Sequence, residues 1–220
     1  MKLDRRTFLG AAGATAMSSA WPARAHRHPG QPASGTLSEL PRGDVLLLDG
    51  IAQKQAAQTL EALLRMDEDA LLRPFRAAAG LPVGPHGLGG WYDASPDFAP
   101  PINMTGYIPG HSFGQYVSAL ARAYAGTGDA RARAKVDRLI AGFAPTITSA
   151  FYQQYPIPAY TYDKIVVGLI DAHAFGENRE ALKLLAPATD AAMPWLPPRA
   201  MDRAETRHAK PNVAFSWDES

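Results

Sequence analysis

The chain of 220 residues contains no cysteine. Disulfides, thiolate metal sites and a cysteine nucleophile are therefore excluded within these residues. No apolar run reaches the length of about 18 residues that a helix needs to cross a bilayer. Neither sign of charge is in excess, since the formal net charge is +1, so we expect neither a nucleic acid nor a membrane as partner of the mature protein. The 46% of hydrophobic residues is instead typical of a globular domain.

The N-terminus has the pattern of an export signal. Arg5-Arg6 precedes Phe8-Leu9, a short and weakly apolar stretch runs from Ala11 to Ala20, and Ala23-Arg24-Ala25 offers a cleavage site. Paired arginines in this position indicate the twin-arginine export machinery as a partner. The alternative is an N-terminal helix with two chance arginines. We predict a signal peptide over residues 1–25, a flexible leader over 26–43 rich in proline, glycine and serine, and a periplasmic or secreted domain over 44–220.

Apolar residues at helical spacing predict that this domain is all-α. Asp67 is placed to cap a second helix and Gly80 to end it, and Asp129 and Asn178 are placed to cap later ones. Two loops are expected, from Pro82 to Pro109 and from Tyr152 to Ala159. The expected helices cover 49–66, 67–80, 110–126, the stripe from Val136 to Ile147, 161–175 and 181–193.

Two of these helices differ in how their apolar residues are distributed. In the helix after Asp129, an apolar stripe opposes a basic side formed by Arg131, Arg133, Lys135 and Arg138. The helix 161–175 is apolar most of the way round, which is expected of a fully buried helix and makes His173 a core residue.

The caps also indicate a repeat. Asp129 and Asn178 stand 49 residues apart, and each follows an apolar helix and precedes a more polar one. A helical hairpin repeated at such a period predicts stacked hairpins, of which the α/α toroid is the closed form. Closure needs roughly 300 residues at this period, so we expect an incomplete toroid. The alternative is a generic helical bundle.

Several motifs from Val45 to about Leu185 occur in the order found in one family. The sequence resembles glycoside hydrolase family 127, the β-L-arabinofuranosidase family, through five segments. These are Leu48–Gln53, expected as a strand-to-helix step, Leu71–Arg76 with Ala79–Leu81, Gly89–Trp91, Gly110–Leu120 and Tyr160–Ala172.

The resemblance implies an (α/α)-barrel glycosidase that retains anomeric configuration and acts on L-arabinofuranosyl or related plant-type glycans. It also implies a zinc-bound cysteine nucleophile, further cysteines and a glutamate acid in the later half of the full-length domain. Because this chain has no cysteine, none of these residues can be assigned here, and we expect a fragment without catalytic residues, cofactor or metal site. Asp163 replaces the histidine that usually follows the Tyr-Thr pair in the family.

Four residues are candidates for sugar binding. His111 opens a helix and can hydrogen-bond a hydroxyl, or cap its own helix. Trp91 follows two glycines and can stack on a sugar ring, or fill the core. Tyr160 and Asp163 begin the most apolar helix, where the carboxylate can accept two hydroxyls or cap the helix. Asp163 and Lys164 are neighbours in a helix, so no ion pair is expected between them.

Other carboxylates and other functions are weaker candidates. Asp218 and Glu219 are adjacent and cannot flank one glycosidic bond, so they are interpreted as solvated acids. Besides an exported glycosidase, the pattern is compatible with a carbohydrate-binding pseudoenzyme or a helical-repeat scaffold for protein partners. The glycine- and proline-rich loop that carries Trp91 favours sugar over protein.

Overall fold

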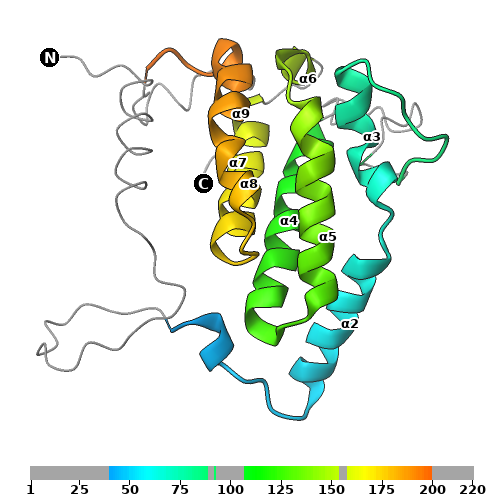
Figure 1. The fold of residues 1–220 in the computed structure, drawn as a ribbon, viewed down its shortest axis with the longest axis vertical. Coiled ribbons are helices and arrows are strands. Elements are labelled where there is room, and N and C mark those ends of the chain that lie inside the picture. The colour runs from blue at the N-terminus through cyan, green and yellow to red at the C-terminus, as the bar shows by residue number, and fades with distance from the viewer. Residues whose placement is uncertain (1–39, 89–91, 93–106, 154–157, 200–220) are drawn as a thin grey trace, which may run out of the picture.

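The computed structural model describes residues 40–88, 92, 107–153 and 158–199 (Figure 1). All regular elements in these ranges are helices, which confirms the all-α prediction; the strand expected before Gly50 is not formed. The 3₁₀ turns are η1 (Arg42–Asp44), η2 (Ala144–Thr146) and η3 (Met193–Trp195). The α-helices are α2 (Ile51–Arg65), α3 (Glu68–Ala78), α4 (Tyr107–Thr127), α5 (Ala130–Phe143), α6 (Ser149–Gln153), α7 (Pro158–Ala174), α8 (Arg179–Lys183) and α9 (Leu185–Ala192).

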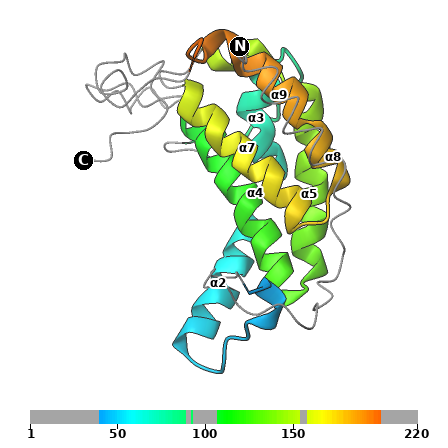
Figure 2. The same ribbon diagram turned by 90° about the vertical axis from the view of Figure 1, so that its left-hand side faces the viewer.

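Two successive hairpins form the body of the molecule. The first is α4 and α5, and the second is α7 followed by α8 and α9. Figure 2 shows α4 and α7 next to each other on one side, with α5, α8 and α9 beside them to the right. The more apolar helix of each hairpin therefore lies next to its counterpart, as the repeat predicts.

The turns within the hairpins form as their residues predict. Gly128 adopts φ 71°, and the Asp129 carboxylate accepts a hydrogen bond from the Arg131 amide at 2.9 Å. In the second hairpin, Glu177 has φ 56° and the side chain of Asn178 accepts from the Ala181 amide at 2.8 Å. A left-handed residue followed by a side-chain cap thus recurs at the predicted interval.

The start of the domain shows the same agreement. The carboxylate of Asp67 accepts a hydrogen bond from the Ala70 amide at 2.7 Å, and Gly80 ends α3 with φ 68°. The last residues of the predicted leader lie against the second hairpin. Arg42 lies with its guanidinium 5.2 Å from the centre of the Phe175 ring, so the chain already packs against the end of α7 at this point.

Helix boundaries differ from prediction where proline intervenes. The expected helix 181–193 is two helices that meet at Leu184, because Pro187 has no N–H to donate to the carbonyl of Lys183. The stripe that was expected to reach Ile147 ends as an α-helix at Phe143, and Pro145 lies in the 3₁₀ turn that follows. The expected loop 152–159 contains the end of α6 and the start of α7.

Four phenylalanines from four helices form the centre of the core. Phe75 of α3 contacts Phe113 of α4, Phe143 of α5 and Phe151 of α6 with ring centroids 4.9, 5.3 and 4.5 Å apart, respectively. Aromatic pairs at these distances add stability beyond the area that they bury. The cluster joins the first hairpin to α3 and α6.

The basic side of α5 is not a solvated face throughout. The side chain of Lys135 is buried, and its Nζ donates to the carbonyl of Leu64 at 2.9 Å and to that of Met66. These are carbonyls at the end of α2, which have no partner within their own helix. A lysine that was predicted to face solvent therefore caps a neighbouring helix.

Helix α7 is not buried on all sides, contrary to prediction. Val167 and Ile170 keep 38% and 44% of their surface exposed, because α4 and the α8–α9 pair cover only two of its faces. Among the described helices, none combines the length and apolar character needed to cross a membrane.

Candidate functional site

The N-terminal ends of α4 and α7 lie at the same end of the molecule. Three contacts between the two helices follow the same order along both of them: Gly110 faces Thr161, Gly114 faces Lys164, and Ser118 bonds to Asp171. The two helices therefore run parallel, and the residues that open each of them are neighbours (Figure 1).

Glycine allows these helices to approach to backbone contact. A Cβ placed on Gly114 would lie 1.9 Å from the carbonyl oxygen of Lys164, and one on Gly168 would lie 2.7 Å from the oxygen of Gly114. No other residue fits at either position without separating the helices. The close approach determines the distance between side chains on the two helix openings.

Two of the predicted binding residues are in contact at this end. The rings of His111 and Tyr160 are stacked, with centroids 5.1 Å apart and an interplanar angle of 28°. Both side chains are half-buried. The structure thus brings together one residue from each hairpin that the sequence marks for sugar contact.

Asp163 is linked to this stack by the ammonium group of Lys164, which contacts both Asp163 and Tyr160. The Nζ of Lys164 is 2.9 Å from the Asp163 carboxylate and 4.9 Å from the centre of the Tyr160 ring. The prediction of no ion pair between Asp163 and Lys164 is wrong. Both side chains are long or mobile enough to bend along the helix, and the ring of Tyr160, four residues before Lys164, provides a surface for the ammonium group.

The environment favours the neutral form of the His111 ring. Burial lowers the pKa of His111 below its usual value, and the positive charge of Lys164 lowers this pKa further. A neutral imidazole offers one N–H donor and one acceptor nitrogen. Such a group can accept a hydrogen bond from one sugar hydroxyl or donate to another.

Thr161 adds a polar group that the sequence did not single out. Its side chain is fully buried, and its hydroxyl has no hydrogen-bond partner within the described part of the chain. Its methyl group instead faces Gly110, where an added Cβ would lie 2.2 Å from it.

The remaining candidates are placed as follows. Trp91 and the acidic pair Asp218 and Glu219 lie outside the described residues. Tyr92, beside Trp91 in the sequence, is buried and its hydroxyl donates to the carbonyl of Leu71. His173 is half-buried, with Nδ1 3.4 Å from the carbonyl oxygen of Asn178.

A second polar cluster lies further along α4 and α7. Asp171 is buried, and its carboxylate accepts from Arg122 Nε at 2.6 Å and Nη2 at 3.1 Å and from the Ser118 hydroxyl at 2.5 Å. Arg122 also stacks on the ring of Phe175, 4.9 Å from its centre. Because every oxygen of the carboxylate is engaged, this cluster joins the two hairpins and leaves little capacity for a ligand.

The described residues do not provide a metal site. Within residues 40–88, 92, 107–153 and 158–199, no three His, Asp or Glu side chains gather in a way that could hold an ion. The resemblance implies cysteine as a zinc ligand, and the whole chain lacks this residue.

The chain matches a known protein family over most of its length. The family model described as beta-L-arabinofuranosidase, GH127 catalytic domain, matches residues 44–216. No curated protein matches the chain.

Proposed function

The chain belongs to glycoside hydrolase family 127, and from this premise we propose that it forms part of an exported glycosidase that acts on L-arabinofuranosyl or related plant-type glycans. In this proposal the described residues supply the sugar-binding end of two hairpins. The nucleophile and the acid are supplied by residues other than these 220.

The observation that carries the proposal is the His111–Tyr160 stack beside Asp163. A sugar presents hydroxyls on its edge and C–H groups on its face. A neutral imidazole and a carboxylate can bind the hydroxyls, and an aromatic ring can pack against the face. All three groups come from the openings of two parallel helices, so they can converge on one ligand.

The hairpin arrangement supports a toroid as the complete architecture. In the proposed ring, α4 and α7 belong to the inner layer, and α5, α8 and α9 to the outer one. The exposed Val167 and Ile170 on α7 are apolar in a position that a further inner element would cover. Zinc, where present, would belong to that further part of the domain.

Export by the twin-arginine route is part of the same proposal. The support is the pattern of residues 1–25, which places paired arginines before a short apolar stretch and a small-residue cleavage site. This route delivers a folded protein to the periplasm or the exterior, where plant glycans are accessible.

The experiment measures L-arabinose released from a β-L-arabinofuranosyl disaccharide by the complete protein. We expect release by the wild type and a loss of about 100-fold in H111A or Y160L, the size expected when two or three kcal/mol of binding energy is removed. K183M, which changes an exposed lysine on α8, serves as the control and should keep full activity.

Three outcomes would contradict the proposal in different ways. Cleavage of pyranosyl but not furanosyl substrates would correct the substrate. Binding of arabinose without any cleavage would identify a binding module. Neither binding nor cleavage, with H111A indistinguishable from the wild type, would remove the sugar site altogether.

A further inference from the structure

Lys164 adopts a position that helix energetics alone does not explain. It lies in the second turn of α7, near the positive end of the helix dipole, where a cation is disfavoured. Its side chain nonetheless lies over the ring of Tyr160, towards the start of the helix, and only 25% of the side chain is exposed. Some local interaction must offset this placement.

The backbone of Lys164 packs directly against the backbone of α4. Its carbonyl group contacts Gly114, and the chain has no room there for even one carbon atom on α4. The Cα of Lys164 is thereby held at a constant distance from α4, the helix that carries His111. The side chain of Lys164 can still change its conformation, and in the structure its ammonium group contacts both Asp163 and Tyr160.

We propose that Lys164 is a positioning residue of the candidate sugar site, which holds the Asp163 carboxylate and the Tyr160 ring in one arrangement beside His111. This inference rests on the proposed function insofar as it concerns sugar. A carboxylate on a flexible side chain would otherwise turn freely into water, and ordering it in advance lowers the cost of binding a hydroxyl.

The His111 ring reports on this arrangement. On α7, the titratable neighbours are Tyr160, Asp163 and Lys164, and the Lys164 charge adds to burial in lowering the pKa of His111. On α6, burial raises the pKa of Tyr152, which therefore carries no charge near neutral pH. On α3, Arg73 donates to the carbonyl of Gly84 and Arg76 donates to the carboxylate of Asp69. A change in the Lys164 charge should therefore be visible at His111.

The experiment compares K164M, K164R and the control K183M in the full chain by following the His111 ring proton in an NMR pH titration. K164M should raise the pKa of His111, because it removes a nearby positive charge. K164R should leave this pKa low, because arginine keeps the charge and stacks on an aromatic ring as well as lysine does. K183M should leave it unchanged.

The same samples are titrated with L-arabinose. We expect K164M to bind about tenfold more weakly than the wild type, as the loss of one oriented charged contact implies. K164R should recover most of this loss. If K164M does not fold, K164Q provides the same test, since an amide keeps a polar head without charge.

The outcomes separate the two proposals. An unchanged His111 pKa in K164M or K164Q overturns the role of Lys164, whatever arabinose does. A raised pKa with equal arabinose binding in wild type and variant also overturns it, because the arrangement would then not serve the ligand. A raised pKa in a protein that does not bind arabinose at all contradicts the proposed function, while it leaves the contact between Lys164 and His111 established.

Discussion

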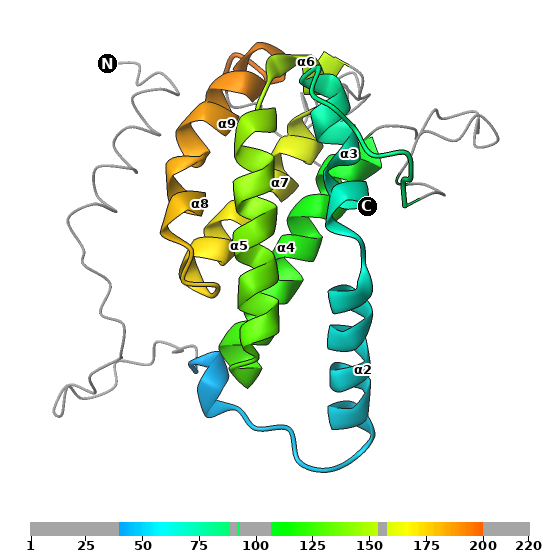
Figure 3. The same ribbon diagram turned by 45° about the vertical axis from the view of Figure 1, so that its right-hand side comes forward.

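Helices α4 and α7 are in direct backbone contact, whereas α2 is attached to the hairpins by side chains. Between α4 and α7, glycines bring the backbones into contact and a buried carboxylate joins the helices. Helix α2 stands apart from the hairpins, as Figures 1 and 3 show, and Leu60 is its only buried residue. It is attached at one end, by Lys135 of α5 and by the hydroxyl of Tyr116, which donates to Leu63.

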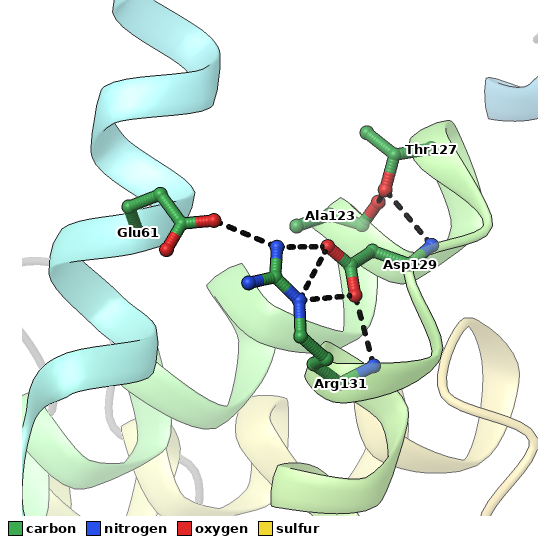
Figure 4. Close-up of polar contacts among 5 residues, drawn as sticks. All are labelled: Glu61, Ala123, Thr127, Asp129 and Arg131. Atoms are coloured by element: carbon green, nitrogen blue, oxygen red, sulfur yellow. Dashed lines mark hydrogen bonds and ion pairs between the residues drawn. The ribbon is translucent and has the colours of Figure 1, made fainter.

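An ion pair at the surface completes the attachment of α2. Arg131 of α5 is 2.7 Å from Glu61 and 2.7 Å from Asp129, so one guanidinium joins the α4–α5 turn to α2 (Figure 4). Contacts of this kind tolerate small shifts of the helix, whereas backbone contact does not. The candidate site is built on the interface that cannot shift, which is what a binding geometry requires.

The largest loss of stability is expected from Gly114→Ala, which tests the backbone contact between α4 and α7. The added carbon would lie 1.9 Å from a backbone oxygen that cannot move aside, so the helices must separate, at a cost of about 3 kcal/mol in unfolding free energy. Gly126→Ala is the matched control, because it lies on the same helix with no atom within 4 Å of the new carbon. The control should stay within about 1 kcal/mol of the wild type. Equal urea midpoints for the two variants would disprove the close contact.

A smaller loss is expected from Asp171→Ala on the same interface. The change removes the acceptor of Arg122 and Ser118, and we expect a loss of about 2 kcal/mol. The loss stays below that of a fully buried pair because 39% of the Arg122 side chain is exposed and can turn to water. Urea unfolding measures it, and a variant as stable as the wild type would show that the buried carboxylate contributes nothing.

On the attachment of α2, Lys135→Met should cost about 1 kcal/mol. Methionine fills a similar volume but leaves the carbonyls of Leu64 and Met66 without their donor. Hydrogen exchange of the α2 amides should increase more than exchange of the α4 amides, because the change loosens one helix only. Uniform acceleration over both helices would show instead that α2 and the hairpins unfold as one unit.

The smallest effect is expected from Glu61→Gln. The ion pair of Glu61 with Arg131 is exposed on both sides and is screened by salt. We expect a slight fall of the melting temperature at low ionic strength and none in 1 M salt, a concentration at which the screening length is about 3 Å. A fall that persists in high salt would mean that the contact is stronger than a surface pair.

The helix ends were predictable because each depends on residues close together in the chain. A carboxylate or amide at Asp67, Asp129 or Asn178 satisfies an amide two or three residues later, and no distant group is involved. Helix interiors were less predictable. Pro187 divides the last helix, and the exposure of Val167 and Ile170 depends on which neighbours cover α7.

The candidate site was predictable residue by residue but not as an arrangement. His111, Tyr160 and Asp163 could be selected because of the resemblance and their positions at helix openings. Their contact could not be derived, because 49 residues separate His111 from Tyr160 and only the approach of Gly114 to Lys164 brings the openings together. Lys164 itself was missed, because helical spacing argues against its pair with Asp163.

The order of amino acids alone decides that the described part of the chain is helical, where the capped helices begin, and that two similar hairpins follow one another, since caps, turns and apolar spacing are local properties. Folding in three dimensions decides that α4 and α7 touch through glycine, that Lys135 caps a neighbouring helix, and that a histidine and a tyrosine stack beside an ion pair. These contacts join residues far apart in the chain, and their geometry exists only once the helices have packed.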